Sequence, residues 1–262
     1  MAAASRTEGE QQFERYLHSL SLPFVYEKPH PGKSKTPDYC VHWKGQSVMF
    51  EIKDFESPPL PTGVGAFSSY PHIRERIVRG RKKFKEYKEF CCALVLYNNG
   101  AFVMLQEADF MLGSMYGDSG WTMPFDPVKG VLDSSSIVRA FLGGGMMLTH
   151  NGEPRNTTIS ALITLSSISP DWQRMVAFMR QNPQMPTSEL EDAMRAKNPS
   201  FDANAVVPRV IVWHNFLARL PFPEDLFCGP YDSHIKLVHT HGDTFERRTL
   251  FRGSELPTTI KV

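Results

Sequence analysis

The sequence has few cysteines, no long apolar run and no large excess of either charge. Its 262 residues include four cysteines, and these show no paired spacing of the kind that binds zinc. We therefore expect reduced, mostly buried thiols in a cytoplasmic protein. No stretch approaches the roughly 18 consecutive apolar residues of a membrane span. The N-terminus also lacks the basic start and apolar core of a signal peptide, so we expect neither a membrane segment nor a secretory leader.

The overall charge gives no sign of a partner. The chain carries 29 Lys and Arg against 28 Asp and Glu, a net charge of +1, so any surface that attracts nucleic acid must be local. Hydrophobic residues make up 41% and charged residues 22%, as in an ordinary globular protein with a sizeable core. No linker is long enough to separate two domains. We expect one domain over residues 1–262.

Residues 36–43 and 48–55 are two β-rich runs that predict a β-hairpin, because a short loop containing glycine separates them. Side chains two apart on a strand share a face, so Glu51 and Lys53 project together. Asp38, at the start of the first run, can reach the same corner. The hairpin therefore brings two carboxylates and one amine together.

This cluster has a chemical interpretation and a structural one. Asp38 and Glu51 offer oxygen ligands for a hard cation such as Mg²⁺, and Lys53 can orient a water or offset charge on a phosphate. An ordinary half-buried strand also alternates apolar and polar residues, so a solvated strand face is the alternative.

The order Pro37-Asp38, then Glu51-x-Lys53, resembles the PD-(D/E)xK nucleases, which include many restriction enzymes and Holliday-junction resolvases. The resemblance implies a restriction-endonuclease-like core, which is an α/β fold with a mixed central β-sheet flanked by helices. It also implies that Asp38, Glu51 and Lys53 are catalytic, and that the two carboxylates hold Mg²⁺ or Mn²⁺.

Residues 8–20 have the apolar spacing of a helix, and Thr7 followed three residues later by Glu10 fits a capping box. The nuclease family commonly carries a metal-binding glutamate on the helix before the hairpin. The resemblance assigns that role to Glu10, with Glu14 as the substitute. A glutamate in the first turn also complements the helix dipole, and this alternative stays open.

Residues 73–89 predict a second helix with an unusual positive charge. Eight basic and three acidic residues give it a local charge of +5, which could follow a phosphate backbone. The basic residues expected at a nucleic-acid interface are Arg74, Arg81, Lys82, Lys83, Lys85 and Lys88. A solvated face strengthened by pairs such as Glu75 with Arg79 is the alternative. Since a helix in this place of the nuclease fold often contributes a lysine or glutamine to the site, Lys82 and Lys83 are also candidates there.

Residues 91–97 form a continuous apolar run that predicts a buried central strand, and residues 101–105 follow it after a turn. Helix, hairpin, helix and strand give an αβββαβ-like succession, the core order of the restriction-endonuclease-like fold. The resemblance covers residues 8–105, and residues 106–262 are a C-terminal elaboration.

Within the elaboration, residues 106–154 predict mostly loop and short helix. The other elements expected there are strands at 159–165 and 206–213 and short helices at 171–180 and 188–197. Thr187 or Ser188 is the expected cap of the last helix. We expect these pieces to extend the sheet and cover it, and residues 215–232 to wrap along the core as an ordered loop.

Together these features predict a metal-dependent endo- or exonuclease that hydrolyses phosphodiester bonds in nucleic acid, with DNA favoured over RNA. Asp38 and Glu51 would hold Mg²⁺ or Mn²⁺, and Glu10 would support the ion. Lys53 would position the attacking water and stabilise the phosphate. The alternative is a catalytically silent nucleic-acid-binding or protein-interaction module with the same fold. No membrane partner is expected, and the sequence predicts no oligomeric state.

Overall fold

The structure, a computed structural model, describes residues 5–55, 70–99, 105, 107–122, 125–126, 130–132, 138–202, 204–239 and 245–254. Its helices are α1 (Glu8–Ser19), α2 (Tyr70–Phe84), α3 (Ala108–Tyr116), α4 (Pro170–Gln181) and α5 (Thr187–Lys197). The strands of the main sheet are β1 (Phe24–Tyr26), β2 (Tyr39–Trp43), β3 (Gln46–Phe55), β4 (Cys91–Asn98), β9 (Ala161–Ile168), β10 (Val207–His214), β11 (Ser233–His239) and β12 (Phe245–Arg252). Two smaller strand pairs join β5 (Gly117–Thr122) to β8 (Val138–Gly144) and β6 (Phe125–Asp126) to β7 (Val131–Leu132).

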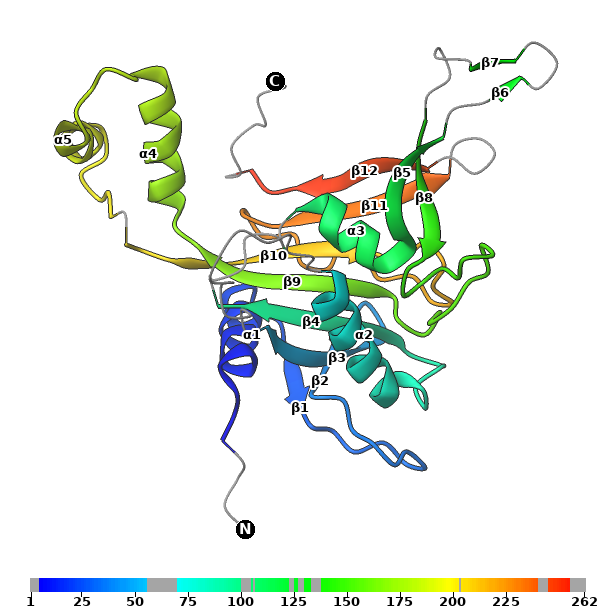
Figure 1. The fold of residues 1–262 in the computed structure, drawn as a ribbon. Coiled ribbons are helices and arrows are strands. Elements are labelled where there is room, and N and C mark those ends of the chain that lie inside the picture. The colour runs from blue at the N-terminus through cyan, green and yellow to red at the C-terminus, as the bar shows by residue number, and fades with distance from the viewer. Residues whose placement is uncertain are drawn as a thin grey trace, which may run out of the picture.

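The main sheet has eight strands in the order β1-β2-β3-β4-β9-β10-β11-β12, with helices against both faces (Figure 1). Parallel pairs join β3 to β4, β4 to β9 and β10 to β11, and the other neighbours are antiparallel. The predicted α/β class with a mixed, helix-flanked sheet is therefore confirmed.

The predicted hairpin is formed by β2 and β3, with Tyr39 paired to Phe50. Its turn consists of Lys44 and Gly45, whose φ angles of 46° and 82° are both positive. Such a turn matches the twist of antiparallel strands and favours glycine at its second position. The loop is therefore two residues shorter than the sequence predicts, and β3 begins at Gln46.

The centre of the sheet follows from the apolar run of β4. Every residue of this strand is buried, as predicted. Parallel neighbours need a crossover connection, and α2 lies in the crossover between β3 and β4. The carboxyl ends of β3 and β4 therefore lie side by side, and Glu51 lies beside Leu94 near the middle of both strands.

Alternate residues of the strands feed two separate cores. On one face, Phe50 packs against Phe13 of α1 and against Phe222 and Phe227. The last two come from the segment between β10 and β11. The prediction that residues 215–232 wrap along the core is confirmed.

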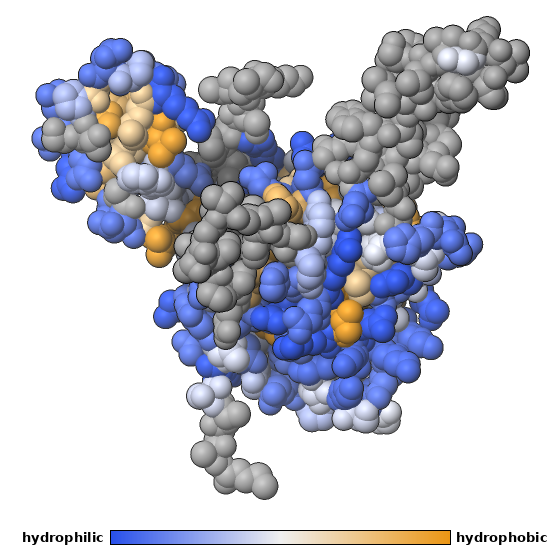
Figure 2. Space-filling model, viewed as in Figure 1, coloured by the Kyte–Doolittle hydropathy of each residue, from blue (hydrophilic) through white to orange (hydrophobic). Residues whose placement is uncertain are grey.

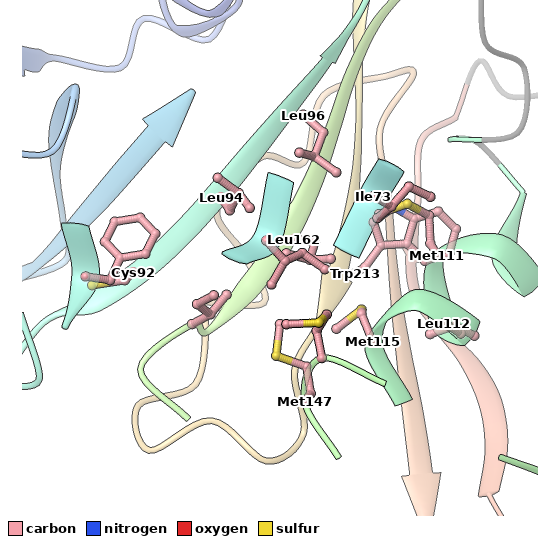
Figure 3. Packing of buried hydrophobic residues seen from close by; sticks show 14 of the residues in the cluster. Ile73, Cys92, Leu94, Leu96, Met111, Leu112, Met115, Met147, Leu162 and Trp213 are labelled. Atoms are coloured by element: carbon pink, nitrogen blue, oxygen red, sulfur yellow. The ribbon is translucent and has the colours of Figure 1, made fainter. Parts of the chain in front are cut away.

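The other face is covered by α2 and α3. Figure 3 shows Leu94 and Leu96 of β4 in this second core with Ile73 of α2, Met111 of α3 and Trp213 of β10. All five side chains are buried. Because Glu51 and Lys53 alternate with Phe50, they lie on the α2 side of the sheet.

The predicted helix at 73–89 is present as α2, with different ends. It begins at Tyr70, and Pro71 fits because the first turn of a helix leaves backbone donors unused. It ends at Phe84, where the chain turns and buries Tyr87. The Tyr87 hydroxyl donates to the Lys35 carbonyl at 2.6 Å, so tertiary contacts outweigh helix propensity over the last five residues.

Several predictions for the C-terminal half were wrong. The segment 106–154, predicted to be mostly loop and short helix, contains α3 and also the strand pair β5 and β8. The last helix is capped by Pro186, without a side-chain hydrogen bond, and not by Thr187 or Ser188. Of the predicted strand at 101–105, all but the buried Leu105 lies outside the described residues.

The helices α4 and α5 do not cover the sheet, contrary to prediction. They project from the body of the molecule (Figure 1) and form a small core of their own from Met175, Leu190, Met194 and Phe201. Figure 2 shows apolar residues gathered on this projection. The strands β9 and β10 do extend the sheet, as predicted. In the part of the chain that the structure describes, no helix combines the length and apolar character needed to cross a membrane.

Candidate active site

The hairpin brings Asp38 and Glu51 together at one corner of the sheet. Asp38 directly precedes β2, and the pairing of Tyr39 with Phe50 places it beside Glu51. The Asp38 side chain also acts as an acceptor for the strand backbone, because Asp38 Oδ2 accepts a hydrogen bond from the Ile52 amide at 2.7 Å. Asp38 is 6% exposed and Glu51 is fully buried. The two carboxylates are thus fixed by the strands themselves.

Two lysines neutralise this pair. Lys53 Nζ donates to Glu51 Oε1 at 2.5 Å, which confirms that the two side chains share a face. Lys83 Nζ, from α2, lies 2.7 Å from Asp38 Oδ1 and 2.8 Å from Glu51 Oε2. Buried carboxylates are tolerated only when opposite charges compensate them, so these contacts explain how the acidic corner can exist inside the fold.

Burial and the neighbouring Asp38 raise the pKa of Glu51 to about 7, although hydrogen bonds and charge from the lysines oppose the shift. Burial alone would lower the pKa of Lys83, yet its hydrogen bond to Asp38 and its ion pair with Glu51 raise that pKa above its usual value. Lys83 therefore stays charged, while burial disfavours the charged form of Glu51 despite its two lysine neighbours.

The geometry gives a direct test of whether a metal ion fits. Glu51 Oε2 is buried, and its described contact is the ion pair with Lys83 Nζ at 2.8 Å, with no hydrogen bond to a described residue. Among the residues with described positions, no three or more His, Cys, Asp and Glu side chains form a metal-binding group. Mg²⁺, however, is often held by one or two carboxylates together with water and substrate phosphates. Asp38 and Glu51 fit such an ion, since their adjacent oxygens already share one cation.

Glu10 and Glu14, the predicted further metal ligands, have partners other than Asp38 and Glu51. The predicted capping box is present: the Glu10 carboxylate accepts from the Thr7 amide at 2.7 Å and lies 3.4 Å from the Tyr26 hydroxyl. Glu14 forms an ion pair with Arg6 and accepts from a tyrosine hydroxyl. Both glutamates belong to α1, which packs on the face of the sheet opposite α2.

The basic residues predicted at a nucleic-acid interface fall into three groups. Arg74 is tied to its neighbours, since it donates to the Gly113 carbonyl at 3.1 Å and pairs with Asp118 at 3.2 Å. Lys83 belongs to the acidic corner. The other four line one hollow of about 380 Å³ together with two polar residues. The lining consists of Arg81, Lys82, Lys85, Lys88, Asn156 and Thr158.

Sequence reasoning missed two features of these sites. It named Lys83 only beside Lys82 as a candidate on its helix, and did not predict that Lys83 bridges both carboxylates. It also gave no role to Asn156 and Thr158, which lie far from α2 in the chain. Helix periodicity could have separated Lys83 from Lys82, because adjacent helical residues point in different directions.

Comparison with known proteins assigns neither a family nor a function to the chain. No family model matches the sequence, and no curated protein or solved structure shows significant similarity to the chain.

Proposed function

We propose that the protein is a metal-dependent nuclease with a restriction-endonuclease-like core of the PD-(D/E)xK class, and that DNA is its substrate. The observation that carries the proposal is the corner where Asp38 and Glu51 meet Lys53. The element order α1-β1-β2-β3-α2-β4 agrees with the αβββαβ succession of that class. The corner lies on the parallel pair β3 and β4, where Glu51 is paired with Leu94 and Lys53 with Leu96.

Each residue has a role that its surroundings support. Asp38 and Glu51 would hold Mg²⁺ or Mn²⁺, which would supply Lewis-acid activation of a water and of the scissile phosphate. Lys53 is partly exposed and bonded to Glu51, so it can orient the attacking water and oppose charge that develops on the phosphate. Lys83 holds the two carboxylates in position before substrate arrives.

A second candidate function also has a specific observation in its favour. Two carboxylates that already face two ammonium groups can form a purely structural network. The protein would then be a nucleic-acid-binding or protein-interaction module that keeps the fold without cleavage. The partial exposure of Lys53 favours the nuclease, because an ammonium group at the surface of the corner can reach a bound substrate as well as Glu51.

Cleavage assays separate the two functions. Purified protein would be incubated with supercoiled plasmid, linear duplex, single-stranded DNA and RNA in Mg²⁺, Mn²⁺, Ca²⁺ or EDTA. We expect cleavage in Mg²⁺ or Mn²⁺ that Asp38→Asn and Glu51→Gln abolish. The matched control is Asp225→Asn, which removes an exposed carboxylate paired with a surface lysine. Binding without cleavage under every condition would establish the second candidate, and equal cleavage by all three variants would exclude this site.

A further inference from the structure

The hollow beside α2 lies on the far side of the helix from the candidate active site. Lys83 points towards the β3 carboxylates, whereas Arg81 Nη1 donates to Asn156 Oδ1 at 2.9 Å, in the segment that leads into β9. In the sheet, β4 separates β3 from β9. One helix therefore presents cations to two different places, and Figure 2 shows a mostly hydrophilic surface in this region.

The charge of the hollow is unbalanced. Its lining contains four cationic side chains, all exposed, and no acidic one. Elsewhere on α2, Arg79 pairs with Glu75 and Lys83 with Asp38. Lys82, Lys85 and Lys88, by contrast, form no ion pair with any acidic side chain in the described part of the chain. Like charges gathered in this way repel one another, and an anion bound among them would relieve the repulsion.

The helix dipole does not account for this arrangement. Cations in the last turn of α2 complement the partial negative charge of its C-terminus, which explains Arg81 and Lys82. Lys85, directly after the end of the helix at Phe84, can share this benefit, but Lys88 lies four residues beyond that end. The dipole therefore does not explain why Lys88 lines the same hollow.

The wall opposite the cations is built from polar groups that are held in place. Asn156 adopts a positive φ of 52°, and its side-chain amide donates to the Met146 carbonyl at 2.5 Å while its oxygen accepts from Arg81. Thr158 adds a hydroxyl to the lining. A fixed guanidinium, mobile ammonium groups and a hydroxyl are the donors that proteins use for phosphate.

We infer that this hollow is a second phosphate-binding site, which holds a backbone phosphate of the nucleic acid on the side of α2 away from the scissile bond. The inference rests on the proposed nuclease function and names how the substrate is held. A helix with its side chains is about 10–12 Å across, so a single nucleic-acid molecule can reach both flanks of α2. The site would supply affinity and position but no chemistry.

The test measures binding separately from cleavage. DNA affinity would be measured in EDTA at several salt concentrations for the parent and for Lys85→Gln/Lys88→Gln. The matched control is Lys44→Gln/Arg79→Gln, which removes two exposed cations that have acidic partners. Thermal unfolding of each variant would show that the fold is intact.

We expect the Lys85→Gln/Lys88→Gln variant to bind DNA about tenfold or more weakly than the parent. The slope of log affinity against log salt should fall by about 0.9 for each phosphate that the variant no longer neutralises. The control should keep the parental slope. In NMR titrations with inorganic pyrophosphate, the amides of Asn156 and Thr158 should shift in the parent and not in the Lys85→Gln/Lys88→Gln variant.

The outcomes distinguish this inference from the proposed function. If the parent never cleaves but the slope changes as expected, the phosphate site stands and the nuclease proposal fails. If the parent cleaves in a manner that needs Asp38, while Lys85→Gln/Lys88→Gln binds DNA like the control, the phosphate site is wrong. Pyrophosphate binding without any change in DNA affinity would assign the hollow to a small phosphate compound, and would also overturn the inference.

Discussion

The ammonium group of Lys83 lies 2.7 Å from Asp38 Oδ1 and joins α2 to the start of the β2–β3 hairpin. The same nitrogen is 2.8 Å from Glu51 Oε2, so one cation compensates both carboxylates. A divalent ion at this corner would bind the same oxygens. Lys83 therefore compensates both carboxylates in the metal-free protein, and it would compete with the proposed metal ion for these oxygens.

Replacing Lys83 by methionine tests this competition. In EDTA we expect Lys83→Met to lower the free energy of unfolding by about 2 kcal/mol, below the full cost of breaking a buried pair because Lys83 is partly exposed. The stabilisation by Mg²⁺ should be larger than in the parent, since no ammonium group competes. Urea unfolding with and without Mg²⁺ measures both effects. Arg79→Met is the control, and a weaker Mg²⁺ response in Lys83→Met than in the parent would contradict the competition.

The structural role of Asp38 can be tested separately from its proposed role as a metal ligand. Asp38→Ala leaves the Ile52 amide without its acceptor, which should cost about 1–3 kcal/mol of unfolding free energy. Asp38→Asn keeps an oxygen for that amide, so its stability in EDTA should stay close to the parental value. Both variants should lose most of the thermal shift that Mg²⁺ gives the parent. A parental Mg²⁺ response in Asp38→Asn would remove Asp38 from the ligands.

The hairpin and the central strand could be predicted because their signals are local. Alternation with a period of two placed Glu51 and Lys53 on one face, and burial on both faces made β4 a continuous apolar run. The strands β5 and β8 gave no such signal. Their glycines, including Gly117 and Gly143, remove the apolar alternation that marks a strand, although the two strands pair in the structure.

The composition of the candidate site could be predicted only in part. Asp38 and Glu51 are adjacent through one hairpin, whose register follows from its short turn. The contact of Lys83 depends on how α2 is rotated over the sheet, and the hollow depends on where the chain passes before β9. Both are set by packing between segments far apart in the sequence, and no local pattern encodes them.

Gly9 shows how a close contact overrides helix propensity. Alanine is favoured over glycine within a helix by about 1 kcal/mol. A Cβ at Gly9, however, would lie 2.1 Å from Asp54 Oδ1 and 2.9 Å from Tyr97 Cβ, so α1 would have to move away from the sheet. Because such overpacking costs about 1–3 kcal/mol, we expect Gly9→Ala to be destabilised by about 1 kcal/mol. Chemical denaturation measures the change, and Gln11→Ala on the exposed side of α1 should stay within about 0.5 kcal/mol of the parent. Stabilisation of Gly9→Ala would show that α1 packs less closely than described.

A buried histidine pair predicts loss of stability in acid. His214 Nε2 lies 3.0 Å from His234 Nδ1, and His234 Nε2 lies 3.0 Å from the Phe227 carbonyl. The carbonyl can only accept, so His234 donates through Nε2 and accepts from His214 through Nδ1. This chain of hydrogen bonds requires a neutral His234 ring, because its Nδ1 accepts, and burial disfavours a charged His214 ring beside it. Burial, aided by the charge of His234 and Lys236, lowers the pKa of His214 to about 3, and burial lowers that of His234 as well.

Because folding lowers the pKa of both histidines, protonation at low pH favours the unfolded chain. An unfolded histidine has a pKa of about 6.5, so the unfolded chain binds more protons as the pH falls below that value. The contribution of the two histidines to stability should therefore be complete above pH 6.5 and decrease below it, by about 1.4 kcal/mol per pH unit for each histidine. His214→Gln keeps a donor for His234 and should reduce the slope between pH 6 and pH 4.5 by one such amount. His42→Gln, at an exposed position, should not change it. Equal slopes for parent and His214→Gln would show that His214 titrates normally.

Lys53 allows chemistry to be separated from binding. It shares a strand face with Glu51 and bonds to it, but as a cation it cannot hold Mg²⁺. It can orient a water and oppose charge that grows on the phosphate in the transition state. Lys53→Met keeps the aliphatic stem, and Lys83 still compensates Glu51, so the variant should remain folded and its Mg²⁺ response and DNA affinity in Ca²⁺ should change little. Single-turnover cleavage under saturating DNA and Mg²⁺ should slow by a factor on the order of a hundred or more, as when one preorganised electrostatic donor is removed.

Lys44→Met, on the turn of the same hairpin, serves as the control and should cleave at the parental rate. Near-parental cleavage by Lys53→Met would make Lys53 an ordinary residue of a solvated strand face and would remove the residue that favours the nuclease over the silent module.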